Sequence, residues 1–395
     1  MPDQRLGVLL LGGNRTHQEN YARALGADPR CLLIAVSDER DVPPERAALN
    51  RALAAELSLP YVADLHEALA RPEVDLVSVC VEHERRARVA VQCAAAGKHL
   101  YLDKPSACTV PGARAIADAA ERCGVRSQVF SFVHTPLARA ARTALDDGAV
   151  GQLRAIHAEV MFAKGPAGSA TLGTPRVQEP FPARFSFPDS KRELRATGVY
   201  GVSLIRWLAP AAVRRVYGIT ANYFFAEHQR NDVEDFGLIS LDLDGGLTAT
   251  VTAGRIGAAS HPRGGPQRLT LVGDRGTLTL DGNRPRLEVF ADEEPWTAGE
   301  PDPEDPMSFW RSTQVRARGP VKRAWLLTRG EGEAPGDARA FVDCILAGRE
   351  AEVTARDGAH AVETLMAAYV SAARGAPVCV DDIAWPPDPA FPAAG

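Results

Sequence analysis

The first third of the chain alternates between short apolar runs and longer stretches in which apolar residues recur every three or four positions. Short apolar runs are typical of strands buried on both faces of a parallel sheet, and the longer period is typical of helices with one buried face. Strands are predicted at residues 6–11, 32–36, 76–81, 100–102 and 127–132. Most of the helices end beside a glycine or a proline, and they are predicted at residues 16–25, 45–57, 64–70, 85–96 and 110–123. The pattern indicates strand–helix units around a parallel sheet.

After residue 135 the pattern changes to runs in which every second residue is apolar, which is typical of strands with one buried face. These strands are predicted at residues 153–161, 213–224, 235–243, 247–255, 268–273, 276–280 and 287–290. Glycine-rich turns join neighbouring runs and favour antiparallel hairpins. Helices are predicted at residues 137–145, 197–208, 335–347 and 355–373. The expected fold is a sheet with helices on one face, and its other face is expected to be covered by self-association.

The chain of 395 residues is too long for one hydrophobic core, because single cores stop growing at about 250 residues. We expect an α/β protein with an N-terminal Rossmann domain, a doubly wound parallel sheet, at residues 1–135. A C-terminal α+β domain with a large, mostly antiparallel sheet is expected at residues 136–384, and its last helix can pack back on the first domain. Residues 385–395 form a Pro- and Ala-rich tail, expected to be loosely attached.

Two long segments do not have the pattern of packed elements. Residues 165–188 are rich in Gly, Pro, Ser and Thr with three phenylalanines, and residues 292–320 are rich in proline and acidic residues. Connections of this length are usually active-site loops or mobile excursions, and the first is a candidate for lining a pocket.

Charge and composition exclude several classes of function. The net charge is −5, from 45 basic and 50 acidic residues, which offers no basic face for nucleic acid or an anionic membrane. No stretch approaches the roughly 18 apolar residues of a membrane span, and the first residues lack the pattern of a signal peptide. Seven scattered cysteines without a C-x-x-C pair indicate reduced thiols, and the nine isolated histidines indicate no metal site. A cytoplasmic protein is expected.

The turn after the first strand is Gly12-Gly13-Asn14-Arg15, followed by the first helix. A Rossmann fold binds a pyrophosphate here, on backbone amides at the helix N-terminus. The G-x-G-x-x-G pattern would place glycines at 12, 14 and 17, and only Gly12 matches, although Asn14 tolerates the left-handed conformation. These four residues are candidate cofactor contacts; a structural turn without a ligand is the alternative.

Asp38 directly follows the second strand. An acid at this position can accept hydrogen bonds from the ribose 2′-hydroxyl and repels a 2′-phosphate, which favours NAD over NADP. Arg40 lies close enough to leave NADP possible. A solvated acid at a strand end, without a ligand, is the alternative.

A more specific signal is the segment A-A-G-K-H-L-Y-L-D-K-P at residues 95–105. It resembles the A-G-K-H-V-x-x-E-K-P segment of the Gfo/Idh/MocA family, which includes glucose-fructose oxidoreductase and inositol dehydrogenase. The A-V-G-Q-L segment at residues 149–153 and L-V-G-D-R-G-T-L at residues 271–278 support the resemblance, which covers nearly the whole chain. It implies a nicotinamide-dependent enzyme acting on sugars or polyols.

The resemblance implies a role for each residue of the Asp103-Lys104-Pro105 segment. Lys104 matches the lysine that points at the substrate hydroxyl and the nicotinamide. Next to a positively charged nicotinamide the pKa of a desolvated lysine is lowered, so that it can take part in a proton relay. Asp103 replaces the usual glutamate beside the cofactor, and the family suggests a cis peptide before Pro105.

A second family signature, D-x-G-x-H-x-x-D, corresponds to residues 196–203. Tyr200 occupies the position of the catalytic histidine, and Ala196 and Ser203 replace the two acids. A tyrosine beside a lysine can donate or accept a proton, because the ammonium stabilises the phenolate. The alternative is that Tyr200 only packs.

The chain also departs from the family's sequence pattern at residues 80–86, where many relatives have T-P-x-x-x-H around the nicotinamide ribose. Glu82 brings a negative charge to this place, while His83 and Arg86 remain candidates for contacting the cofactor.

The leading hypothesis is therefore an NAD(P)-dependent oxidoreductase that moves a hydride to or from a secondary alcohol or carbonyl of a sugar, polyol or similar molecule. We expect a homodimer or homotetramer formed through the C-terminal sheet. Two alternatives stay open because of the altered cofactor segments. One is a non-redox enzyme with permanently bound NAD, and the other is a binding protein that has lost the nucleotide site.

Overall fold

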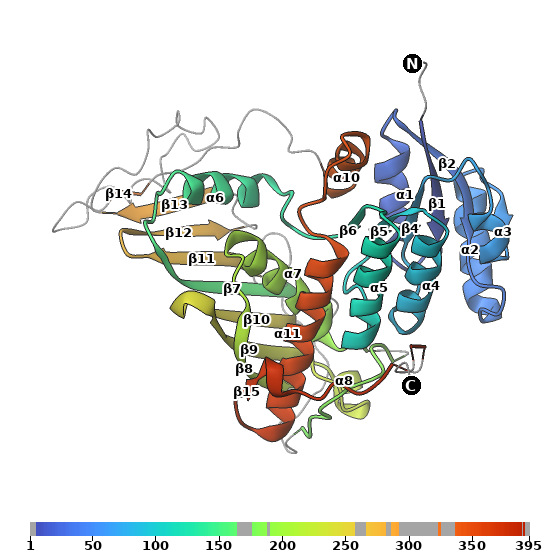
Figure 1. Cartoon of the computed structure of the whole chain (residues 1–395). Coiled ribbons are helices and arrows are strands. Elements are labelled where there is room, and N and C mark those ends of the chain that lie inside the picture. The colour runs from blue at the N-terminus through green and yellow to red at the C-terminus, as the bar shows by residue number, and fades with distance from the viewer. Residues whose placement is uncertain are drawn as a thin grey trace.

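The computed structural model describes residues 5–163, 176–187, 190–256, 266–281, 286–291, 323–324, 336–388 and 390–391. Within these ranges the chain forms two sheets that lie side by side, with the long helix α11 (Ala355–Arg374) between them (Figure 1). No helix in the described part of the chain has the length and apolar character needed to cross a membrane. The expected α/β fold with a parallel and a mostly antiparallel sheet is confirmed.

The first sheet has six parallel strands in the order β3-β2-β1-β4-β5-β6. They are β1 (Leu6–Leu11), β2 (Cys31–Ser37), β3 (Tyr61–Val62), β4 (Leu76–Val79), β5 (His99–Leu102) and β6 (Ser127–Val129). The helices between them are α1 (Gln18–Gly26), α2 (Pro44–Glu56), α3 (Leu65–Leu69), α4 (His83–Ala95) and α5 (Val110–Arg122). The strand order reverses between β1 and β4, and ligands of such sheets bind at the carboxyl ends of the strands at this switch point.

Both faces of this sheet are buried, which explains why its strands are apolar throughout. In β1, Leu9 and Leu11 belong to the core cluster that includes α4 and α5. Val8 and Leu10 belong to a separate cluster with α1 and the helix α10 (Asp337–Leu346). Alternate side chains of one strand therefore face two different helix layers.

The second sheet has nine strands in the order β14-β13-β12-β11-β7-β10-β9-β8-β15. They are β7 (Leu153–Ala163), β8 (Val213–Ala221), β9 (Phe236–Leu243), β10 (Thr248–Ile256), β11 (Gln267–Gly273), β12 (Gly276–Asp281), β13 (Arg286–Ala291), β14 (Arg323–Ala324) and β15 (Val378–Cys379). All paired strands are antiparallel except β7 and β10, which run parallel. The remaining helices are α6 (Pro136–Asp146), α7 (Glu193–Leu208) and α8 (Ala226–Arg230).

Helices α7 and α11 cover one face of this sheet, and α11 also packs against α5 of the first domain (Figure 1). At this contact the backbone amide of Val129 donates to the carbonyl of Val353 at 2.8 Å. A β-carbon at Gly358 of α11 would lie 2.7 Å from the Val129 side chain, so the close approach requires glycine. The last helices thereby fix the second sheet against the carboxyl edge of the first.

The C-terminal residues pack more firmly than the sequence suggests. The ring of Trp385 meets Phe181 edge-on at 6.3 Å between centroids, and Phe391 packs against the main core. Asp388 accepts a hydrogen bond from Thr109. The aromatic rings give this Pro- and Ala-rich segment apolar surface to bury. Residues 392–395 and the acidic segment 292–320 lie outside the described residues.

Candidate active site

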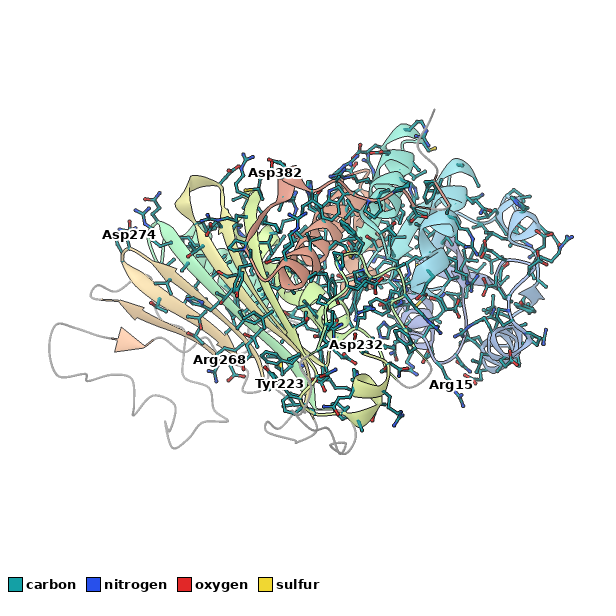
Figure 2. The ribbon with its side chains drawn as sticks, turned by 90° about the horizontal axis from the view of Figure 1, so that it is seen from below. Arg15, Tyr223, Asp232, Arg268, Asp274 and Asp382 are labelled. Atoms are coloured by element: carbon teal, nitrogen blue, oxygen red, sulfur yellow. The ribbon has the colours of Figure 1, made fainter. Side chains whose placement is uncertain are left out.

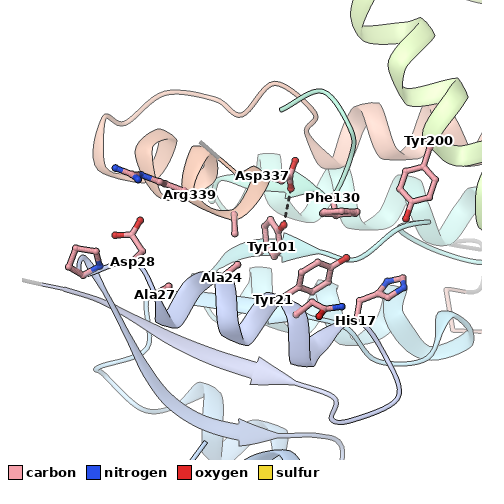
Figure 3. Close-up of a pocket in the computed structure, with 14 residues that line it drawn as sticks. His17, Tyr21, Ala24, Ala27, Asp28, Tyr101, Phe130, Tyr200, Asp337 and Arg339 are labelled. Carbon is pink, nitrogen blue, oxygen red and sulfur yellow. Dashed lines mark hydrogen bonds between the residues drawn. The ribbon is translucent and has the colours of Figure 1, made fainter. Parts of the chain in front are cut away.

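Two cavities meet at the carboxyl edge of the first sheet. The first, of about 330 Å³, contains Lys104 and is called the lysine cavity here. The second, of about 630 Å³, lies between α1 and α10 and is called the α1/α10 groove (Figure 3). His17 and Tyr200 line both, so the two spaces adjoin at these side chains. Phe185 and Phe187, from the segment predicted as a candidate pocket loop, line the lysine cavity.

Lys104 is placed by the end of β5 and by the start of α7. The Lys104–Pro105 peptide is cis, and the lysine is 8% exposed. Its Nζ donates a hydrogen bond of 2.7 Å to the carbonyl oxygen of Ala196. Helix α7 begins at Glu193, one turn before the predicted residue 197, and this extra turn contains Ala196. A main-chain carbonyl thus accepts from the lysine at the position where the family signature has an acid.

Tyr200 lies next to Lys104, but the contact differs from the expected one. The ammonium lies over the face of the phenol ring, 4.5 Å from its centroid. The ring also stacks on Phe132, with centroids 4.0 Å apart and planes within 5°. Burial, with a further contribution from Asp103, raises the pKa of Tyr200 well above its ordinary value. The ammonium thus meets the ring face of Tyr200, and burial raises the pKa of its hydroxyl, so a proton-transfer role for Tyr200 stays a prediction.

Asp103 is buried and holds a group of polar side chains together. Its Oδ1 accepts from the Tyr21 hydroxyl at 2.6 Å and lies 2.9 Å from Nδ1 of His17. Its Oδ2 accepts from Nη2 of Arg86 at 2.9 Å. Burial alone would raise the pKa of Asp103, but Arg86 and His17 outweigh it and hold the pKa well below the usual range. Asp103 is thus a carboxylate that orients its neighbours.

His83 lies in the lysine cavity beneath Phe185. Their rings stack with centroids 3.8 Å apart, and Nε2 of His83 is 3.3 Å from the Lys104 carbonyl oxygen. Burial, together with the positive charge of Arg86, lowers the pKa of His83 well below its ordinary value. His83 is therefore a neutral side chain that packs beside the lysine.

The turn after β1 keeps its two glycines for steric reasons. Gly12 has a φ of +93°, and a β-carbon there would lie 2.8 Å from the carbonyl oxygen of Cys80. A β-carbon at Gly13 would lie 2.5 Å from Cα of Asn50 in α2. Both glycines are thus required by the packing of the protein itself, whether or not a pyrophosphate binds.

The other two residues of this turn do not face a common ligand position. Nδ2 of Asn14 donates to Glu56 at 2.6 Å, and its carbonyl oxygen accepts from Arg46 at 2.9 Å. Arg15, with a φ of +62°, is exposed at the periphery of the molecule (Figure 2).

Asp38 is fully engaged inside the protein. Its side chain is 0% exposed, and it accepts from Nη1 and Nη2 of Arg85 at 2.5 and 2.9 Å. Nδ2 of Asn50 donates to the same carboxylate at 2.8 Å. Arg85 also pairs with Glu82, which in turn pairs with Arg46. Arg85, 47 residues away in sequence, thus occupies the carboxylate that the sequence assigns to the ribose, and the ribose contact of Asp38 stays a prediction.

The residues described so far suit the nicotinamide end of a dinucleotide better than its adenosine end. At the reaction end, Lys104, His83 and Tyr200 border an open cavity that can take a ring and a small substrate. At the adenosine end, Arg85 supplies the hydrogen bonds that ribose hydroxyls would make to Asp38. A hydrogen bond from a ribose hydroxyl to Asp38 would therefore require Arg85 to leave the carboxylate.

The sequence missed three residues of the site. In the sequence, His17 stands where the G-x-G-x-x-G pattern has its third glycine. Tyr21 and Arg85 lie inside predicted helices. Tyr21 and His17 meet Asp103 from 82 and 86 residues away. A polar residue at a position that normally needs glycine was the available signal.

Comparison with known proteins agrees with this architecture. A family model described as the oxidoreductase family with an NAD-binding Rossmann fold matches residues 6–131. A model described as the GFO/IDH/MocA C-terminal domain matches residues 138–279. Among solved structures, levoglucosan dehydrogenase in complex with NADH and L-sorbose superposes with a TM-score of 0.72 at 18% identity, over 96% of this chain and 100% of that one.

Curated relatives match over shorter stretches. The dehydrogenase aclE of Aspergillus oryzae is 34% identical over 131 residues, which cover 32% of this chain and 35% of that protein. Levoglucosan dehydrogenase of Pseudarthrobacter phenanthrenivorans is 26% identical over 193 residues, covering 43% of this chain and 48% of that protein. The chain thus spans between about a third and a half of the length of these relatives. With both domains matched in order and the fold shared end to end, the chain belongs to the Gfo/Idh/MocA family of NAD-binding oxidoreductases.

Proposed function

We propose that this protein is an NAD(P)-dependent dehydrogenase or reductase acting on a secondary alcohol or carbonyl of a sugar, polyol or similar small molecule. The observation that carries the proposal is the buried Lys104, whose ammonium group borders a cavity of about 330 Å³ at the carboxyl edge of the parallel sheet. Relatives and neighbours that act on levoglucosan or bind L-sorbose support a polyhydroxylated substrate.

The lysine cavity has the side chains that a polyhydroxylated molecule needs. Besides Lys104, it is lined by hydroxyl, carboxylate and cationic groups, namely Ser190, Lys191, Glu193, Thr197 and Arg255. Such groups donate to and accept from hydroxyls, while Phe162 and Phe185 cover the apolar face of a ring. The mixture favours a neutral, hydroxyl-rich substrate.

The bound cofactor supplies the hydride acceptor or donor for this chemistry. Lys104 orients the reacting oxygen and stabilises negative charge that develops on it. His83, neutral and stacked under Phe185, fills the space beside the lysine and helps to exclude water. Tyr200 remains protonated and donates a hydrogen bond to the substrate or packs against it.

The test begins with titration of the purified protein with NADH and NADPH, followed by nicotinamide fluorescence. Saturable binding, followed by cofactor reduction with members of a panel of sugars and polyols, is the expected result. Lys104→Met should abolish turnover and leave binding within a few fold. Absence of both binding and hydride exchange would refute the proposal.

One observation favours a second candidate, a binding protein without dinucleotide. Arg85 occupies Asp38, and Glu82 adds a negative charge in the same segment. This candidate predicts that neither cofactor binds at millimolar concentration, even to a variant in which Arg85 is shortened. NAD that copurifies without net turnover would instead indicate a non-redox enzyme.

We also propose a homodimer or homotetramer through the second sheet. Its β8 strand exposes Tyr217 and Ile219, which are 37% and 41% exposed, on the face away from α11. Light scattering coupled to size exclusion should give at least twice the monomer mass, and Ile219→Glu should reduce it.

A further inference from the structure

His17 is the N-cap residue of α1, and its side chain reaches beyond the turn into the candidate active site. Its side chain makes no capping hydrogen bond to the helix, and it is 41% exposed. The ring lines both the lysine cavity and the α1/α10 groove, so it borders the space where the two meet. Figure 3 shows His17 and Tyr200 at the same end of the groove.

The Nδ1 atom of His17 contacts the Asp103 carboxylate, and the Nε2 atom takes no part in that contact. Nδ1 lies 2.9 Å from Oδ1 of Asp103, a carboxylate that is itself held by Tyr21 and Arg86. A buried carboxylate on Nδ1 fixes the orientation of the imidazole and the tautomer that leaves Nε2 as an acceptor. This is the arrangement in which a histidine serves as a general base.

The other candidates for proton transfer are less suited. Tyr200, at the family's histidine position, is a neutral phenol whose pKa is raised by burial. Ala196 has replaced the acid that would pair with such a histidine, and Lys104 donates to its carbonyl. His83 is stacked under Phe185 and directs Nε2 towards a backbone carbonyl.

We propose that the acid/base function of this active site resides on His17, with Asp103 as its positioning residue. The inference rests on the proposed dehydrogenase function and assigns its proton transfer. In the oxidative direction the substrate O–H bond breaks and its proton goes to Nε2 of His17. The hydride from the same carbon goes to oxidised nicotinamide, so the alcohol becomes a carbonyl and the cofactor is reduced. Reduction runs through the same atoms in reverse.

The titratable groups around the His17–Asp103 pair come from several elements. They are Tyr21 of α1, Arg86 of α4, Lys104 after β5 and Tyr200 of α7. Burial raises the pKa of both tyrosines, and the Asp103 carboxylate lies between the His17 imidazole and the Arg86 guanidinium.

The experiment compares His17→Gln with wild type in pre-steady-state and steady-state assays, using the cofactor and a substrate found in the screen. We expect kcat to fall at least a hundredfold with little change in NADH affinity, because general acid–base catalysis contributes 10²- to 10⁴-fold. The acid limb of the pH–rate profile should disappear, and added imidazole should restore part of the rate. The exposed His66→Gln on α3 is the matched control and should behave as wild type.

A readout without cofactor separates positioning from catalysis. In ¹⁵N-labelled protein, imidazole nitrogen shifts should report Nδ1–H as the neutral tautomer of His17 in wild type and a mixture in Asp103→Asn. If wild type turns over substrate while His17→Gln keeps its kcat and pH profile, the assignment to His17 is wrong. If wild type itself binds no dinucleotide, the proposed function fails first.

The α1/α10 groove supports a second, independent inference about the substrate. Its walls include four aromatic rings, Tyr21, Tyr101, Phe130 and Tyr200, and the small side chains Ala24, Ala27 and Ala338. It runs along α1, from His17 before the helix to Asp28 after it, and the helix itself is about 14 Å long at the rise of 1.5 Å per residue. Tyr21 and Tyr101 meet edge to face, with centroids 5.2 Å apart, and both rings are largely buried in the groove wall.

We infer that the substrate carries a flat apolar ring next to its reacting polyol part, and that this ring lies in the groove. The assignment rests on adjacency, because the groove and the lysine cavity share His17 and Tyr200 in their walls, and on the aromatic walls, which favour planar groups. An aryl glycoside is the simplest molecule of this kind. This inference also rests on the proposed function.

The test uses p-nitrophenyl and methyl glycosides of a sugar that the enzyme oxidises. We expect the aryl compound to have a KM at least tenfold lower. Ala24→Phe, a change at an exposed position that fills the groove, should remove this advantage by raising the KM of the aryl glycoside more than that of the methyl glycoside. Ala55→Phe on α2 is the control. Equal KM values for the two glycosides in wild type, or an equal effect of Ala24→Phe on both, would overturn the inference.

Discussion

At the carboxyl edge of the first sheet, two strands are each followed by a buried aspartate that pairs with an arginine. The two aspartates differ in their remaining partners. At the end of β2, Asp38 is bound by Arg85 and Asn50, and its oxygens are used up inside the protein. At the end of β5, Asp103 is bound by Arg86 and Tyr21, but a third partner, His17, borders two cavities. Burial and ion pairing alone therefore do not mark a reaction centre; a polar partner that reaches a cavity does.

The largest expected effect on kcat comes from changing Lys104, beside Asp103. Lys104→Met removes the cation from the lysine cavity and keeps its approximate volume, so kcat should fall by about 10³-fold, within the range of lost acid–base or electrostatic catalysis. NADH affinity measured by fluorescence should change by less than about threefold. A variant with more than a tenth of the wild-type kcat would place the reaction elsewhere.

The next largest effect is expected beside Asp38, at the end of β2. Arg85→Gln leaves the buried Asp38 with Asn50 as its remaining side-chain donor, and breaking such a pair lowers the free energy of unfolding by about 3 kcal/mol. Ribose hydroxyls can then reach the carboxylate, so NADH should raise the Tm of the variant more than that of wild type.

Arg88→Gln provides the control for this measurement. Arg88 pairs with Glu39 at the surface and is 45% exposed, so its loss should change stability by less than about 0.5 kcal/mol. An equal NADH-induced Tm shift in wild type and Arg85→Gln would show that Arg85 does not compete with the cofactor.

A smaller effect on activity, although not on stability, is expected at Asp337, a buried acid in the α1/α10 groove that has no cationic partner at hydrogen-bond distance among the residues that the structure describes. Tyr101 donates to it at 2.8 Å, and Nε2 of His134 lies 3.8 Å away. Burial raises the pKa of Asp337 to about 7. Between about pH 4 and 7 the folded protein keeps a proton that the unfolded chain releases, so stability from this group falls as pH rises through that window.

Asp337→Asn should remove this decline. Relative to wild type, the variant gains stability as pH rises from 4 to 7, reaching about 4 kcal/mol above pH 7 for a shift of about three pKa units. Denaturant unfolding across this pH range measures it, with the half-buried Asp343→Asn of the same helix as control. A constant difference between variant and wild type at all pH values would contradict the shift.

The sequence by itself determined the architecture. The apolar runs of β1 and β4 and the helical periods between them follow from burial on both faces of a parallel sheet, and the alternation in β9 follows from burial on one face. These are local patterns, which repeat within a few residues and can be read without knowing the partner. The D-K-P segment placed Lys104 for the same reason, since it is continuous in sequence.

The tertiary structure decided which charges meet. Arg85 reaches Asp38 across 47 residues, and His17 reaches Asp103 across 86, because parallel strands bring their carboxyl ends to one edge whatever their separation in the chain. Helix α7 begins at Glu193, and its Ala196 carbonyl accepts from Lys104, which lies 92 residues earlier in the chain. Periodicity predicts what is buried, whereas the pairing of polar groups is set by topology and by the space left between packed elements.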